Sequence, residues 1–249
     1  MGLAALGVPL AAFLTAYIGY TGAAWARVVA EVAAPLDLTR HTDVPDIPAL
    51  DRFQATHLLP TNAVNIPLNR WQRRLDDAFT GTHHGQAVQV MIGWMGIPGK
   101  DGRTAFGGLL AILPQPTPRA GTVTVRSVHD GGYGQTRVTT GDPAFDGRFH
   151  LYADNPDAAR TLAGPRLRET LLALQSTLWA RCGALRAVFG QGDVLVAFEK
   201  GTTAFSPPSP WLDRAAAVAD LNRLIAAITL PHRLLDALEA DHANAPPTP

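Results

Sequence analysis

Residues 122–126, Thr-Val-Thr-Val-Arg, indicate the fold most directly. Polar and apolar side chains alternate there with a period of two, which is the pattern of a β-strand with one buried and one solvated face. Residues 87–94, 104–113 and 135–140 have the same strand character. Glycine-containing turns lie between these segments and no helical pattern intervenes, so the sequence predicts an antiparallel sheet.

Two helices are predicted beyond the next strand, residues 149–153. Asn155 is a good helix cap, Pro156 suits the first helical position, and an acid follows at Asp157. A longer helix is predicted over residues 165–182. Its apolar stripe has spacings of four, three, four and four residues: Leu167, Leu171, Leu174, Leu178 and Cys182.

The C-terminal part is predicted to hold a hairpin and two more helical segments. Residues 185–189 and 194–198 have strand character and flank a Gly-Gln-Gly-Asp turn. A helix is expected over residues 210–229, and Pro231 separates it from a last amphipathic segment. The predicted fold class is therefore α+β, an antiparallel sheet packed by central and C-terminal helices.

Residues 27–67 contain five prolines and predict an extended, turn-rich connector with a short helix at residues 49–58. The next segment, residues 68–79, is predicted to be helical. Its apolar side chains are spaced four residues apart: Trp71, Leu75 and Phe79.

The first 26 residues carry no charged side chain. Residues 3–25 would span roughly 34 Å as a helix, enough to cross a hydrocarbon core of about 30 Å. Arg27 and Arg40 follow, and the tendency of cytoplasmic flanks to be basic places the globular part in the cytoplasm. We therefore expect a single-pass cell-membrane anchor; a cleaved signal peptide and a buried soluble helix are the alternatives.

The predicted organisation has four parts. Residues 1–26 are the transmembrane anchor, 27–67 the connector, 68–240 the α+β domain and 241–249 a disordered tail.

Composition excludes several classes of function. The chain has 21 basic and 21 acidic residues, a formal net charge of zero and a pI near 7.1. Nucleic-acid-binding domains usually carry a basic face, so no nucleic-acid partner is expected. The lone cysteine, Cys182, excludes an internal disulfide framework and a cysteine-rich zinc site.

Two histidine-containing pairs are the candidates for acid–base or metal chemistry: His83-His84, before a strand, and His129-Asp130, at a turn. A metal needs three or more converging ligands, and adjacent residues on a strand point to opposite faces. No His-Glu-x-x-His motif is present either. We therefore predict no metal site, no cofactor and no catalytic residue.

Four acids in the middle of the chain lack the spacing of a calcium-binding loop and are predicted to act in turns and caps: Asp142, Asp146, Asp154 and Asp157. Arg160 is predicted to make an internal ion pair with a nearby acid, because its planar guanidinium can hold a carboxylate by two hydrogen bonds. Binding of an external anion by Arg160 is the alternative.

Residues 145–152, Phe-Asp-Gly-Arg-Phe-His-Leu-Tyr, precede the Ala159-Arg160 pair and the leucine-rich segment at 167–174. This pattern resembles a bacterial family of membrane-associated proteins known as a domain of unknown function. The likeness extends from about Asp76 to Leu238. Asn155 stands where the family carries an acid. The resemblance implies one or two N-terminal membrane helices and no known catalytic residues.

The sequence thus favours a membrane-anchored, non-enzymatic domain that binds a protein partner or ligand at the cytoplasmic face. One alternative is a hydrolase-type enzyme that uses His83, His84, His129 and Asp130 on the rim of the sheet. The other is a structural subunit of an envelope complex.

Overall fold

The structure is a computed structural model. It describes residues 23–24, 26–42, 48–59, 72–96, 104–115, 121–128, 135–178, 182–190, 192–200 and 214–244.

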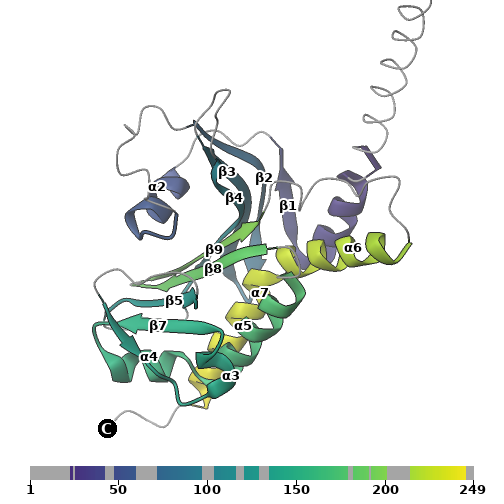
Figure 1. Cartoon of the computed structure of the whole chain (residues 1–249). Helices are drawn as coiled ribbons and strands as arrows, with labels where there is room; N and C mark the ends of the chain where they lie inside the picture. Colours follow the sequence, from purple (N-terminus) through teal and green to yellow (C-terminus); the bar gives the residue numbers. More distant parts are fainter. Residues whose placement is uncertain are drawn as a thin grey trace, which may run out of the picture.

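A nine-stranded antiparallel sheet in the order β1-β2-β3-β4-β9-β8-β5-β7-β6 forms the centre of the described chain (Figure 1). The strands are β1 (Leu38–His41), β2 (Gln72–His83), β3 (Gln86–Gly96), β4 (Thr104–Pro114), β5 (Val123–Ser127), β6 (Thr136–Val138), β7 (Phe149–Ala153), β8 (Cys182–Phe189) and β9 (Asp193–Lys200). The helices are η1 (Ala34–Leu36), α2 (Pro48–Ala55), α3 (Pro143–Asp146), α4 (Pro156–Leu162), α5 (Pro165–Leu178), α6 (Arg214–Ile228) and α7 (Leu230–Ala243). The predicted α+β class with an antiparallel sheet is confirmed.

The central strands of the sheet are buried on both faces. Along β4, the odd-numbered Leu109, Ala111 and Leu113 belong to the core beneath α5, α6 and α7, whereas Phe106 and Leu110 belong to a second core beneath α2. Successive side chains of a strand point to opposite faces, so a central strand covered on both sides is apolar at nearly every position. Figure 1 shows α2 on one side of the sheet and the long helices on the other.

The predicted helix at residues 68–79 is wrong over residues 72–79, which belong to β2. The pairing of β2 with β3 shifts register between Leu75 and Asp77, as a β-bulge does. The extra residue reverses the alternation, so Leu75 and Ala78 lie in the core beneath α2 while Phe79 lies in the opposite core. The spacing of four between Leu75 and Phe79 therefore arises from a bulged strand and not from a helical stripe.

Two further predictions need correction. Cys182 does not lie on the stripe of α5, because that helix ends at Leu178 and Cys182 begins β8. The β5 strand has no solvated face, since all of its residues are buried. Thr124 and Arg126 point to the face that was expected to be wet, and they are only 7% and 3% exposed. The segment after α2 contacts Arg126 and Gln135 contacts Thr124, and local alternation cannot reveal either contact.

The cap predictions near α3 and α4 are confirmed. The Asp142 carboxylate accepts hydrogen bonds from the main-chain N–H groups of Ala144 and Phe145, and Asn155 caps α4 in the same way. Proline occupies an early helical position in both helices.

Part of the chain expected as connector is packed. Residues 26–33 are helical, and Val29, Ala33 and Leu38 are buried in the core shared with α5, α6 and α7. The predicted membrane anchor lies almost entirely outside the described residues. Among those that are described, no helix has the length and apolar character needed to span a membrane.

Candidate functional site

A cleft of about 290 Å³ opens on the α2 face of the sheet, beside the end of α2. Such a volume is close to the lower end of the range for small-molecule sites, which begins at about 300 Å³. Its walls come from the end of α2 and the segment after it, from β5, β7 and β8, and from residues next to β5, β6 and β7. The lining residues are Ala55, Thr56, His57, Thr122, Thr124, Arg126, Gln135, Tyr152, Asp154 and Val188.

Two arginines of the sheet hold the wall formed by residues 55–59. Arg126 Nη2 donates to the carbonyl of His57 at 3.0 Å, and Arg186 Nη1 donates to the carbonyl of Leu58 at 3.3 Å. Arg186 also contacts the carboxylate of Glu199 at 3.1 Å. Buried guanidinium groups need hydrogen-bonding partners, and these carbonyls provide them where α2 has ended.

Polar side chains define the opposite wall. Thr124 Oγ1 donates to Gln135 Oε1 at 3.0 Å, and Gln135 Nε2 donates to the carbonyl of Thr122 at 3.3 Å. The Tyr152 hydroxyl lies 3.3 Å from Nδ1 of His150, and the exposed carboxylate of Asp154 completes the rim. Hydroxyl, amide and carboxylate groups therefore face one small opening.

His150 supports this wall from β7. Burial lowers the pKa of His150, and the positive charge of Arg137 lowers it further. Both effects favour the neutral imidazole, whose Nδ1 can accept a hydrogen bond from the Tyr152 hydroxyl.

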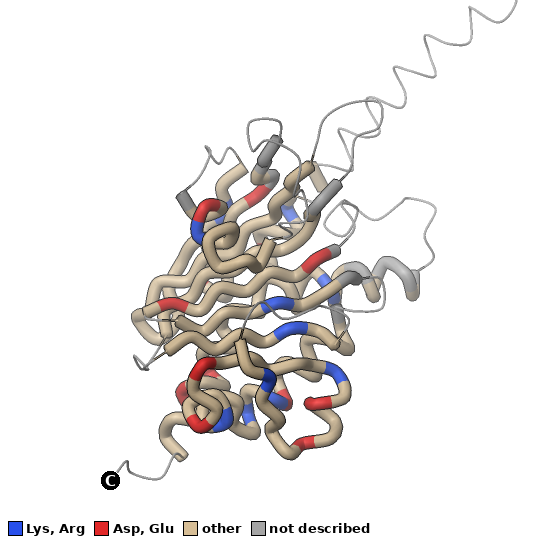
Figure 2. The backbone as a smooth tube through the Cα atoms, turned by 60° about the vertical axis from the view of Figure 1, so that its left-hand side comes forward, with Lys and Arg blue, Asp and Glu red and all other residues tan. Residues whose placement is uncertain are grey.

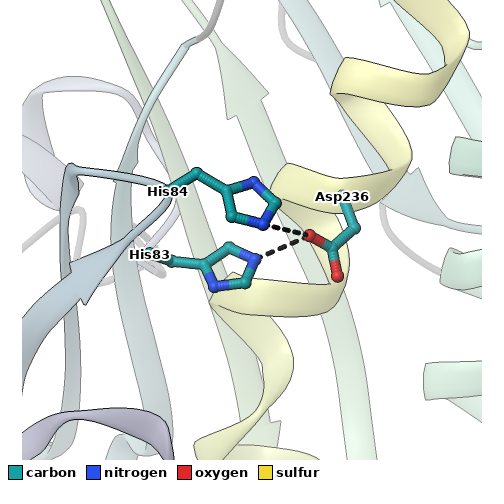
Figure 3. A group of neighbouring side chains, drawn as sticks. All are labelled: His83, His84 and Asp236. Atoms are coloured by element: carbon teal, nitrogen blue, oxygen red, sulfur yellow. Dashed lines mark hydrogen bonds and ion pairs between the residues drawn. The ribbon is translucent and has the colours of Figure 1, made fainter.

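A second constellation lies on the other face of the sheet, where the β2–β3 hairpin meets α7 (Figure 3). His83 ends β2 and pairs with Gln86, leaving His84 and Gly85 as the two turn residues. Both have positive φ, 51° for His84 and 76° for Gly85, as a type I′ turn requires. The turn breaks the strand alternation, so the His83 and His84 rings stack with centroids 4.0 Å apart. The expectation that these adjacent histidines point in opposite directions is wrong.

Helix α7 presents His232, Asp236 and Glu239, spaced four and three residues apart, which places them on one face of the helix. His83 Nε2 lies 2.6 Å from Asp236 Oδ1, and His84 Nδ1 lies 2.9 Å from Glu239 Oε2. His84 Nε2 lies 3.9 Å from the same Asp236 oxygen. We call His83, His84, Asp236 and Glu239 the hairpin–helix cluster.

His232 lies beneath this cluster and is 6% exposed. Its ring meets that of His83 edge to face, and its Nε2 lies 3.3 Å from the carbonyl of Leu36. Burial lowers the pKa of His232, and the neighbouring His83 lowers it as well, while the bond to Leu36 raises it in part. The net lowering favours a neutral imidazole at this position.

The structure brings together only part of the predicted histidine set. His83 and His84 lie side by side, whereas His129 and Asp130 lie outside the described residues. Asp236 and Glu239 were not among the predicted site residues. Their spacing on one face of α7 is the only sequence signal for them, and it does not show which part of the chain they meet.

Arg160 lies at the surface. Its Nη1 pairs with Asp157 Oδ1 at 2.8 Å, and the two side chains are 52% and 92% exposed. The predicted ion pair with a nearby acid is therefore present, within one turn of α4, and Arg160 Nε also donates to the carbonyl of Thr139 at 3.4 Å. Basic and acidic positions are interspersed along the described backbone in Figure 2.

Comparison with known proteins gives three results. No curated protein matches the sequence. The crystal structure of the mycobacterial trehalose monomycolate transport factor A, TtfA, is similar at 15% identity and a TM-score of 0.41, over 90% of this chain and 98% of that one. Likeness at this level carries no functional inference. Residues 101–239 match the family described as protein of unknown function (DUF3137). Because this match extends over more than half of the chain, the protein belongs to the DUF3137 family.

Proposed function

We propose that this protein is a membrane-anchored, non-enzymatic binding domain that takes a small polar ligand in the cleft beside α2. The observation that carries the proposal is the convergence of hydroxyl, amide and carboxylate groups on an opening of about 290 Å³. A few well-placed polar groups in a concave site fix the orientation of a ligand and give specificity. The matching ligand is a small molecule with several hydroxyl or amide groups.

Thr124 and Tyr152 provide the sharpest test of the cleft. T124V and Y152F each remove one hydroxyl while nearly preserving shape, and T39V changes an exposed threonine of β1 far along the sheet order. A library of small polar metabolites is screened by the thermal stability of the full chain. Compounds that bind in the cleft raise the melting temperature of the native chain and of T39V but have a smaller effect on T124V and Y152F. Equal stabilisation of all four chains, or no stabilising compound, contradicts the proposal.

The membrane part of the proposal depends on residues 1–26, which carry no charge. The full chain should sediment with membranes and be released only by detergent, whereas a chain without residues 1–26 should stay in the supernatant. Recovery of the intact full chain in the supernatant contradicts the anchor. The cytoplasmic orientation is predicted from Arg27 and Arg40. It is tested by adding protease outside spheroplasts, which should leave a C-terminal tag intact.

One observation favours the enzymatic alternative, the histidine–carboxylate contact at the hairpin–helix cluster. His83 paired with Asp236 is an arrangement that a general base can use. Full-length protein and an H83A/H84A variant are assayed with chromogenic carboxyl and phosphate esters. Turnover that depends on these histidines supports a hydrolase and contradicts the non-enzymatic proposal.

A structural role in an envelope complex predicts instead that the chain co-purifies with other membrane proteins through residues 1–26.

A further inference from the structure

We propose that the hairpin–helix cluster is a binding site for a divalent transition-metal ion of the zinc class. In this site His83, His84 and Asp236 are ligands and Glu239 is an outer partner. The three residues offer one ligand atom each, and these atoms all lie within 4.8 Å of one another. Figure 3 shows both imidazoles directed at the carboxylate of α7. This site is separate from the cleft beside α2 and does not depend on it.

The distances suit a metal ion after small side-chain rotations. Zinc bonds to nitrogen and carboxylate oxygen of about 2.0–2.2 Å place the ligands of a tetrahedral site about 3.3 Å apart. The Asp236 oxygen is 2.6 Å from Nε2 of His83 and 3.9 Å from Nε2 of His84, values on either side of that separation. Asp236 is 54% exposed, so its carboxylate can turn toward His84 without disturbing the core.

Glu239 supplies the second observation. Metal-binding histidines usually donate their other ring N–H to a carboxylate, which fixes the ring and raises its basicity. His84 Nδ1 lies 2.9 Å from Glu239 Oε2, while Nε2 of the same ring faces Asp236. A simple ion pair between a histidine and Asp236 does not require a second carboxylate on the far nitrogen. In this arrangement Glu239 holds the ring of His84 while Nε2 of that ring is directed at the metal position.

The ligand set selects the class of ion. Two imidazole nitrogens and one carboxylate oxygen suit zinc, whereas calcium and magnesium prefer sites made of oxygen. Asp236 and His84 are each 54% exposed, so an ion can enter from solvent and keep a water molecule as its fourth ligand.

A bound ion would join two elements that are distant in sequence, since His83 and Asp236 are separated by 153 residues. The hairpin between β2 and β3 would be fastened to α7 on the outside of the core. A metal that binds this site only in the folded chain stabilises the fold in proportion to its concentration and affinity.

Titration of the purified, metal-free full chain with Zn²⁺ by isothermal titration calorimetry tests the site. We expect one ion per chain at the cluster, with an affinity reduced at least about tenfold by D236N and further by H83A/H84A. E239Q should weaken binding by about ten- to a hundredfold, the usual effect of losing an outer-shell partner. The matched control is H41A, which removes an exposed histidine of β1, and its affinity should equal that of the native chain.

A second readout separates loss of binding from loss of folding. Zn²⁺ should raise the melting temperature of the native chain and of H41A but not that of H83A/H84A. The metal-free melting temperatures show that each variant is folded. If H83A/H84A binds Zn²⁺ as tightly as the native chain, or if the native chain binds none, the metal site is ruled out. Either result leaves the cleft proposal intact, because that is tested with T124V and Y152F.

Discussion

The carboxylate of Asp241 lies directly over Gly164. A Cβ atom placed on Gly164 would come within 2.4 Å of Asp241 Cγ. The same carboxylate accepts hydrogen bonds from the main-chain N–H groups of Arg166 and Leu167, at 3.0 and 2.8 Å. Helix α5 thus receives its N-terminal cap from the far end of α7, and the close approach needs a residue without a side chain at position 164.

We predict that G164A and D241A each destabilise the protein and that their effects are not additive. D241A removes the cap and should lower the free energy of unfolding by about 0.5–2 kcal/mol. G164A forces the carboxylate away and should lower it by about 1–3 kcal/mol. Because the clash disappears with the carboxylate, the double variant should lose less than the sum, as measured by urea denaturation.

Gly190 offers a matched control for the comparison of G164A, D241A and the double variant. A Cβ atom there would meet only the carbonyl oxygen of Asp193, at 3.9 Å, which is an ordinary contact. G190A should therefore have little effect on stability. Strict additivity of G164A and D241A would show that the two residues do not act on each other.

The second prediction concerns the buried Arg186. R186M keeps the volume but removes the hydrogen bonds to the Leu58 carbonyl and Glu199. Hydrogen bonds to a charged group contribute about 1.5–3 kcal/mol, so the covering segment, residues 48–59, should open more often. Hydrogen exchange monitored by mass spectrometry should show faster exchange in that segment. R166M, at a residue whose side chain is 66% exposed, should leave exchange there unchanged; equal exchange in both variants would mean that Arg186 does not hold the segment.

A third prediction follows from the lowered pKa of His150. Well above the unfolded pKa of about 6.5, His150 is neutral in both states and pH has no effect through it. As the pH falls through that value, the unfolded chain takes up a proton that the folded chain resists, so stability is lost. H150Q should therefore lose less stability than the native chain between about pH 7.5 and 5.

R137Q tests the second cause of that shift. Since the positive charge of Arg137 contributes to lowering the pKa of His150, R137Q should reduce part of the pH effect. Urea denaturation at several pH values measures both variants. Parallel curves for the native chain and H150Q would contradict the prediction.

The fourth prediction compares two charged side chains. R160A should change the free energy of unfolding by less than about 1 kcal/mol, because exposed ion pairs contribute little. The Asp146 carboxylate accepts hydrogen bonds from the N–H groups of Thr140 and Gly141 and from the Thr140 hydroxyl. D146A should cost about 1.5–3 kcal/mol. Thermal denaturation distinguishes the two variants, and a larger loss of stability in R160A than in D146A would contradict this prediction.

Local signals predicted most elements of the fold. The β7 strand has the expected bounds, and α4 begins behind the expected Asn155 cap, because side-chain alternation and capping depend on residues only a few positions apart. The local signals gave a wrong prediction at β2. There a β-bulge interrupts the strand alternation and leaves apolar residues spaced as they would be in a helix. The covered face of β5 was also missed, since the residues that cover it lie more than sixty positions earlier in the chain.

What the sequence alone determined is the class of fold, the positions of most strands and helices, and the likeness to a family of unknown function. Each follows from patterns within short windows. Only the tertiary structure decided that His83 and His84 face the same way and meet Asp236 and Glu239. That meeting depends on the left-handed backbone of His84 and on the packing of α7 against the sheet, and neither is encoded in the spacing of the histidines themselves.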